Sequence, residues 1–74
     1  MRSAREIIEI LIAKKEEELW EAKVQEWIYM LEAVKPVNIT KGKAEEGMAI
    51  YQKRIKALEQ HIEIYNKYLN EHNL

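Results

Sequence analysis

A heptad repeat in the C-terminal half of the chain is the feature that most restricts how it can fold. Apolar or aromatic residues recur at alternating steps of four and three from Ala44 to His72. This spacing keeps one line of side chains on a single helix face, against a partner helix. The members of this heptad line are Ala44, Met48, Tyr51, Ile55, Leu58, Ile62, Tyr65, Leu69 and His72. The repeat predicts one long helix that is packed along its whole length.

The N-terminal half predicts another long helix, which ends before the single proline. Ser3 and Glu6 have the spacing of a capping box, in which two side chains satisfy the first free backbone donors of a helix. Pro36 disfavours helical backbone at the residue before it, so the helix should end at about Lys35. We therefore expect the first helix to cover residues 3–34.

The connection between the two helices is short. Thr40 is the expected N-cap of the second helix, which then covers residues 41–72. A loop as short as residues 35–40 requires the two helices that it joins to pack antiparallel. The whole chain, residues 1–74, is thus expected to be a single all-α domain, an antiparallel two-helix hairpin.

Two lines of apolar residues run along the first helix. The line that repeats the four–three steps most regularly is expected to face the second helix, and it comprises Ile10, Ala13, Glu17, Trp20, Val24, Trp27, Leu31 and Val34. Glu17 interrupts this line, where it either fixes the register or extends to the solvent at the edge. A second line is then left for another surface, and it comprises Ile8, Ile12, Leu19, Ala22 and Met30.

The second helix has more apolar surface than one partner helix can cover. Ile50, Ala57 and Ile64 each lie one residue before a member of the heptad line, which widens the apolar arc to roughly 160°. A chain of 74 residues without cysteine has a small core, which oligomerisation commonly supplements. We expect two hairpins to form a four-helix bundle, a homodimer. The expected self-association residues are Ile50, Ala57, Ile64, Ile8, Ile12 and Leu19.

Gly47 lies inside the expected second helix, where glycine costs about 1 kcal/mol relative to alanine. It is either tolerated near the helix start or forms a notch for a bulky side chain of the first helix. The antiparallel register favours the notch, with Trp27 or Ile28 as its occupant.

The sequence has no arrangement of side chains that is typical of catalysis or metal binding. Neither His61 nor His72 has a glutamate three residues before it, as the histidine ligands of di-iron bundles do. Without cysteine there is no thiolate ligand, and Ser3, the only serine, is expected to act as a helix cap. We therefore predict a protein that is not an enzyme, with no catalytic residues, no metal and no cofactor.

The apolar segment 7–13 is the candidate for a contact with another protein. It is shorter than the ~20 residues that span a membrane, and Glu9 interrupts it, so no membrane partner is expected. Because no signal sequence or cysteine is found, the expected localisation is cytoplasmic. Ile7 and Leu11 point away from both apolar lines and are expected to bind a partner protein. Alternatively, the end of the second helix, at Leu69 and Leu74, covers them.

These features predict a small non-enzymatic protein that self-associates and acts through protein–protein interaction. Regulators, inhibitors, adaptors and assembly factors, including those encoded by phages or viruses, have this profile. The first alternative is an RNA- or DNA-binding hairpin dimer that uses Lys53, Arg54 and Lys56, although the net charge of −1 provides no overall attraction to nucleic acid. Its architecture resembles that of ROP-type plasmid regulators, hairpin dimers that bind RNA, but no sequence motif is shared. The second alternative is a designed or purely structural bundle, against which the irregular loop argues.

Overall fold

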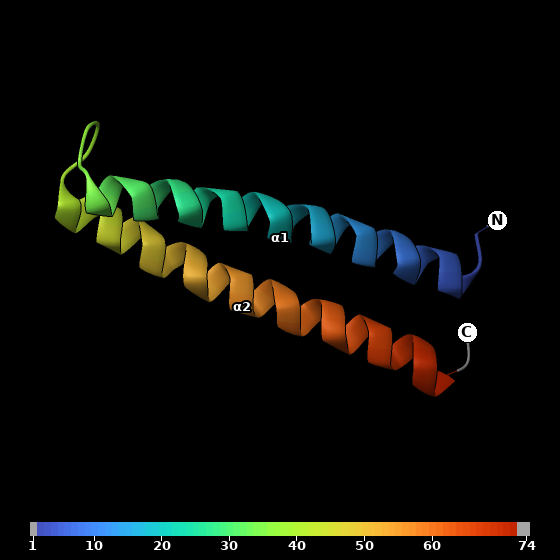
Figure 1. Ribbon diagram of the computed structural model, residues 1–74. Coiled ribbons are helices and arrows are strands. Elements are labelled where there is room, and N and C mark those ends of the chain that lie inside the picture. Colours follow the sequence, from blue (N-terminus) through green and yellow to red (C-terminus); the bar gives the residue numbers. More distant parts are fainter. Residues whose placement is uncertain (1, 73–74) are drawn as a thin grey trace.

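The computed structural model describes residues 2–72, which form two long antiparallel helices. Helix α1 covers Ala4–Val34 and helix α2 covers Lys41–His72. The helices lie side by side, with the loop at one end of the molecule and the start of α1 and the end of α2 at the other (Figure 1). The molecule measures 50 × 21 × 12 Å and is therefore only one helix thick in its shortest dimension. The expected all-α antiparallel hairpin is confirmed.

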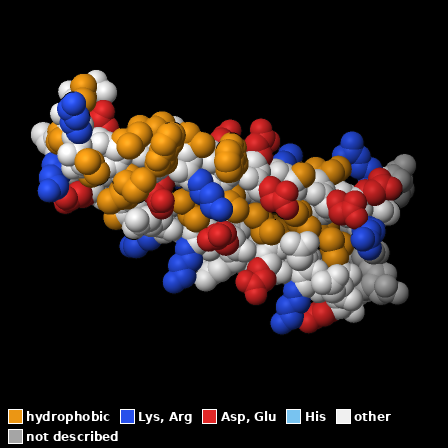
Figure 2. All heavy atoms as spheres, viewed as in Figure 1, with side chains coloured by type: hydrophobic (Ala, Val, Ile, Leu, Met, Phe, Trp, Pro, Cys, Tyr) orange, Lys and Arg blue, Asp and Glu red, His pale blue; other side chains and the backbone are white. Residues whose placement is uncertain are grey.

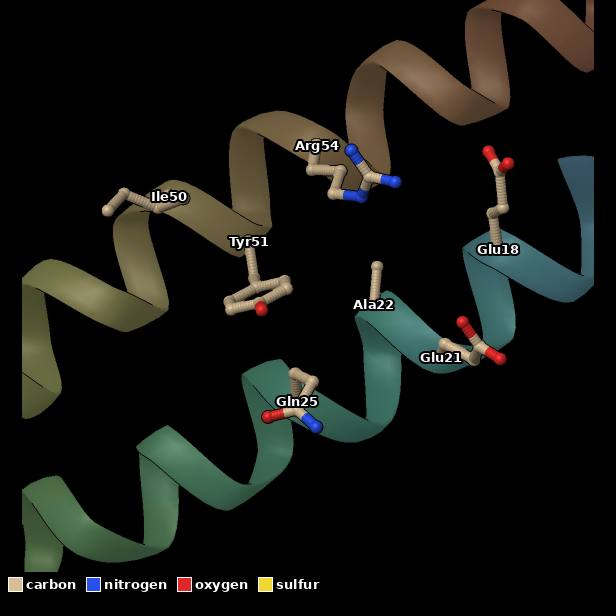
Figure 3. A pocket seen from close by; sticks show the side chains of 7 residues that line it. All are labelled: Glu18, Glu21, Ala22, Gln25, Ile50, Tyr51 and Arg54. Atoms are coloured by element: carbon tan, nitrogen blue, oxygen red, sulfur yellow. The ribbon is translucent and has the colours of Figure 1, made fainter.

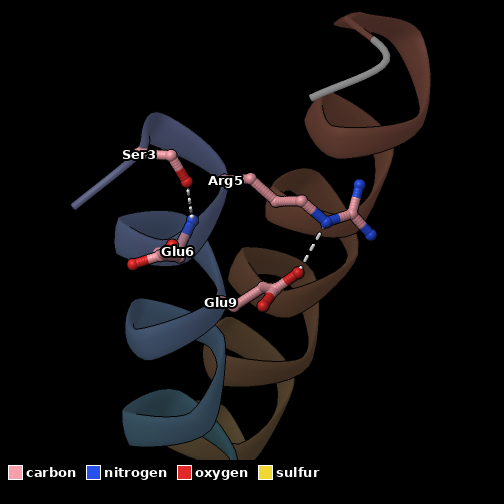
Figure 4. Close-up of polar contacts among 4 residues, drawn as sticks. All are labelled: Ser3, Arg5, Glu6 and Glu9. Atoms are coloured by element: carbon pink, nitrogen blue, oxygen red, sulfur yellow. Dashed lines mark hydrogen bonds and ion pairs between the residues drawn. The ribbon is translucent and has the colours of Figure 1, made fainter.

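Side-chain caps fix where each helix begins. The backbone N–H of Glu6 donates to Ser3 Oγ at 3.2 Å, and Arg5 Nε pairs with Glu9 Oε1 at 2.7 Å in the next turn (Figure 4). At the start of α2, the backbone N–H of Lys43 donates to Thr40 Oγ1 at 3.3 Å. Each hydroxyl satisfies a backbone donor that the helix itself leaves free. The observed helix bounds therefore lie within one residue of the expected ones.

The heptad line of α2 faces α1, as expected. Ala44, Leu58 and Leu69 are buried, and Leu58 is only 4% exposed. The other members of the line are half-buried, except for His72, which is exposed at the C-terminal end of α2. Gly47, one residue before a member of this line, is buried as well. The four–three spacing thus predicted the packing face of α2 correctly.

The face of α1 that packs on α2 is not the expected one. Trp20 and Trp27, which were expected to point inward, are 69% and 57% exposed. Most of the buried and half-buried residues of α1 instead form another line with four–three steps: Ile8, Ile12, Lys15, Leu19, Ala22, Glu26, Tyr29 and Ala33. The other half-buried residues of α1 are Ile10, Glu18 and Glu32. Lys15 and Glu26 are tolerated there because long charged side chains can bury their stems and keep their charges in water. The expectation that the line through Trp20 and Trp27 packs against the second helix is therefore wrong.

The two helices pack closely at Gly47, which leaves no room for a line of indoles between them. A Cβ atom built on Gly47 would lie 2.5 Å from Tyr29 Cε1, far closer than two carbon atoms can approach. The Tyr29 ring also stacks on Tyr51, with ring centroids 5.8 Å apart and an interplanar angle of 27°. The expected notch therefore exists, but Tyr29 occupies it rather than Trp27 or Ile28. A line of indoles on this face would hold the two helices too far apart for that contact.

The structure divides the expected self-association residues into two groups. Ile8, Ile12 and Leu19 belong to the inner line of α1, so the hairpin itself already covers Ile12 and half-covers the other two. Ile50 and Ile64 are 64% and 60% exposed, and Ala57 between them is exposed as well. The role of Ile50, Ala57 and Ile64 in self-association stays a prediction. The role of the first group also stays a prediction, although its three residues already line the contact between the two helices.

The Glu32 carboxylate organises the loop between the helices. Its Oε2 accepts hydrogen bonds from the backbone N–H groups of Val37 and Asn38 at 2.9 and 3.1 Å, and its Oε1 accepts one from Asn38 Nδ2 at 2.9 Å. The backbone donors of Val37 and Asn38 lower the pKa of Glu32, since they stabilise the charged form. This carboxylate therefore ties the end of α1 to the loop that leads into α2.

We expect replacement of Glu32 by glutamine to reduce the pH dependence of hairpin stability. Because the pKa of Glu32 is lower in the folded state, its contribution is present above the ordinary carboxyl pKa and is lost as the pH falls from there through the lowered pKa of the folded state. Thermal unfolding of Glu32→Gln and wild type, followed by circular dichroism from neutral to acidic pH, measures the difference in slope. Glu59→Gln, at an exposed position of α2, is the control and should keep the wild-type slope. Equal slopes for all three proteins would contradict this role of Glu32.

Candidate functional site

The outer side of α1 carries a continuous row of exposed apolar side chains in the half nearer the loop. We call this row the tryptophan stripe; its members are Trp20, Val24, Trp27, Leu31 and Val34. When the inner line of α1 is placed at heptad positions a and d, the stripe falls at positions b and f, which point away from α2. Figure 2 shows hydrophobic side chains gathered over this part of α1. A patch of this kind marks a candidate interaction surface.

The stripe has the surface relief of a helix-packing site. Trp20, Lys23, Val24 and Trp27 surround a shallow hollow of about 320 Å³. Residues at these relative positions, i, i+3, i+4 and i+7, form the four-residue hole that accepts one side chain from a facing helix in coiled-coil packing. The stripe is therefore shaped to receive another helix lying along α1.

Charged residues border the stripe at its two ends. Glu16 and Glu17 lie on the N-terminal side and are exposed, while Lys35 lies on the C-terminal side, directly after the helix. Because Glu17 is exposed, it extends to the solvent instead of fixing the register between α1 and α2. Ile28 and Met30 extend the apolar surface sideways and are 44% and 41% exposed. The stripe has an acidic end and a basic end.

The residues expected to bind a partner protein lie elsewhere on α1. Ile7 and Leu11 are at the far end from the loop, beside the inner line, and both are partly exposed. Leu69 is buried against the hairpin, and Leu74, which was the alternative cover for these residues, lies outside the described residues. Ile7 and Leu11 are therefore accessible at the surface of the described part of the chain.

The basic residues of α2 do not form one continuous patch. Arg54 lies at a groove of about 530 Å³ between the helices, where Glu18 and Glu21 of α1 line the opposite side (Figure 3). Lys53 and Lys56 are exposed and occupy helix positions that point away from α1. The two carboxylates offset the positive charge of Arg54, so the electrostatic attraction for nucleic acid is weak here.

Within residues 2–72, no three acidic or histidine side chains lie close enough together to hold a metal ion. In the same part of the chain, neither helix has an apolar stretch long enough to cross a membrane. The chain matches no protein-family model, and comparisons with curated proteins and with solved structures gave no match.

The candidate site is therefore chosen from the structure alone. It is the tryptophan stripe, which the sequence assigned to the interior but which the structure leaves exposed.

Proposed function

We propose that this chain is a non-enzymatic helical hairpin that self-associates into a dimer of four helices and acts by binding another protein. The observation that carries the proposal is the amount of large apolar surface that the hairpin leaves uncovered, above all Trp20 and Trp27. Monomeric soluble proteins rarely expose contiguous apolar patches of this kind. A regulator, inhibitor, adaptor or assembly factor of cytoplasmic location is the class of protein that we propose.

Self-association is supported by the shape of the hairpin. A molecule only 12 Å thick has no interior layer beyond the contact between its two helices. Chains below about 70–80 residues seldom gain enough stability from such a core, and pairing of two hairpins is a common remedy. Molar mass measured by light scattering across a dilution series tests this part of the proposal: we expect a dimer that dissociates on dilution.

Binding of another protein is assigned to Ile7 and Leu11, which are accessible at the end opposite the loop. We expect the double substitution Ile7→Lys and Leu11→Lys to preserve helicity and dimer mass but to weaken capture of the partner from the native host at least roughly tenfold. Capture is quantified with and without nuclease, beside a control with Lys53→Glu and Lys67→Glu on the exposed side of α2.

Each result of that experiment has a distinct meaning. Loss of helicity in the Ile7 and Leu11 variant would show that these residues stabilise the hairpin, and it would contradict their assignment to a partner. If the captured material is lost on nuclease treatment, the bound species is nucleic acid instead of a protein.

A further inference from the structure

We infer that a second copy of the chain docks on the tryptophan stripe, with the two α1 helices packed against each other in antiparallel orientation. This inference rests on the proposed function, because it names the surface through which the hairpin self-associates. The available apolar area, the small core of the single hairpin, the spacing of the stripe and the charges at its ends support it.

The stripe offers enough apolar area for a homodimer interface. Trp20 and Trp27 are each more than half exposed, and an aromatic side chain buries about 150–250 Å² when it is covered. Two-fold pairing therefore removes roughly 400–600 Å² of indole surface from water. Val24, Leu31 and Val34 of both copies raise this area toward the roughly 1,200 Å² at which specific interfaces begin.

A second copy is favoured over an unrelated partner because the single hairpin has so little core. The buried apolar residues among those described are Ile12, Ala22, Ala44, Leu58 and Leu69. Two of these are alanines, which contribute little apolar area. A symmetric pair covers the stripes of both copies at once. Because the stripes point away from α2, the four helices then lie in a row, and one contact adds buried apolar surface to two molecules.

The first four residues of the stripe are spaced symmetrically about their centre, as an antiparallel pair requires; Val34, the fifth, then lies level with Glu17 of the second copy. Trp20, Val24, Trp27 and Leu31 are separated by four, three and four residues, an order that is the same in both directions. In antiparallel pairing about this centre, Trp20 faces the second copy's Leu31, and Val24 faces the second copy's Trp27. Each indole then meets an aliphatic side chain, which is the alternation of large and small residues that fills a helix interface.

The charges at the ends of the stripe favour the same orientation. Antiparallel pairing places Glu16 and Glu17 of one copy near Lys35 of the other, so that opposite charges meet at both ends. Parallel pairing would place the acidic ends side by side and would also align the two helix dipoles. The antiparallel arrangement is thus favoured by electrostatics as well as by shape.

The interface can be tested with one charged substitution on each candidate surface. Trp27→Glu alters the stripe, and Ile64→Glu is the matched control on the exposed side of α2, where the exposed fraction is similar. We expect Trp27→Glu to raise the dimer dissociation constant roughly 100- to 1,000-fold, since the substitution occurs twice in a symmetric interface. Ile64→Glu should leave the constant unchanged within error, as measured by sedimentation equilibrium.

Two further measurements work even when a charged variant fails to fold. Trp20 and Trp27 are the only tryptophans of the chain, so the emission of the unmodified protein should move to longer wavelength as the dimer dissociates on dilution. The chain has no cysteine, so a nitroxide on Glu16→Cys is unique in each copy. Antiparallel pairing separates the two labelled positions by about 28 Å along the helix axes, at about 1.5 Å per residue. Parallel pairing would place them at the same level.

The possible outcomes separate this inference from the proposed function. A dimer that Ile64→Glu dissociates and Trp27→Glu does not would overturn the inference and leave self-association intact. The same holds for a dimer whose tryptophan emission is unaffected by dilution, or whose labels lie side by side. A wild-type protein that stays a folded monomer at every concentration would overturn both.

Discussion

Truncation of Leu58 to alanine is expected to remove most of the stability of the hairpin. Leu58 is 4% exposed in the middle of α2, and it is one of the few large side chains that the hairpin buries. Leucine-to-alanine substitutions at buried sites cost about 2–5 kcal/mol, because they remove apolar contacts and leave a cavity. A core of this size supplies only about 3–5 kcal/mol in total. A urea titration followed by circular dichroism should therefore show Leu58→Ala partly unfolded without denaturant.

Ile64→Ala is the matched control for that experiment. Ile64 lies on the same helix and is 60% exposed, so its truncation should change the free energy of unfolding by no more than about 0.5 kcal/mol. Both variants must be compared at one protein concentration, since association adds to apparent stability. Equal losses in the two variants would mean that Ile64 is covered in solution, as the four-helix bundle first expected from the sequence requires.

The packing face of α2 could be predicted because the sequence offers only one strong candidate. Its heptad line is continuous from Ala44 to His72, while the positions farthest from that line hold polar residues such as Lys53, Gln60 and Lys67. A helix of this composition has only one face that gains appreciably from burial. The capping residues Ser3 and Thr40 likewise act locally, so sequence spacing was sufficient to place the helix starts.

The packing face of α1 could not be predicted from apolar content. The tryptophan stripe is the more hydrophobic of its two lines, yet the line with Lys15 and Glu26 faces α2. We attribute this choice to close packing of the helices at small buried residues such as Gly47 and Ala22, where a line of indoles would not fit. The sequence did contain one signal of the packing face, which is Gly47. A notch at this glycine has room for a ring from α1, and Tyr29 lies level with it in the antiparallel hairpin.

The wrong packing face of α1 also explains why the sequence does not indicate the candidate site. When Trp20 and Trp27 are expected in the interior of the hairpin, they are not candidates for a surface that self-associates. The accessible residues Ile50 and Ile64 were identified because they widen the apolar arc of α2, and that argument depends on one helix only. Features that depend on the helix separation were therefore missed, and features local to one helix were found.

Replacement of Gly47 by alanine is expected to destabilise the hairpin, although alanine is the better helix former. The added methyl would lie 2.5–2.7 Å from three ring carbons of Tyr29, and the ring cannot move without disturbing its stack on Tyr51. We expect a net loss of about 1–3 kcal/mol, because overpacking and the lost stack outweigh the gain of about 1 kcal/mol in helix propensity. Gly42→Ala is the control, since no atom lies within 4 Å of its added methyl, and it should be neutral or stabilising by up to about 1 kcal/mol.

A double-mutant cycle isolates the contact between Gly47 and Tyr29. In a Tyr29→Ala background the ring is absent, so Gly47→Ala should become stabilising by about 1 kcal/mol, the reverse of its effect in the wild type. Free energies of unfolding from urea titrations of the four proteins at one concentration measure this coupling. If Gly47→Ala stabilises the wild-type protein as much as Gly42→Ala does, no ring occupies the notch. The close packing that we infer to exclude the tryptophans from the hairpin interior would then be absent.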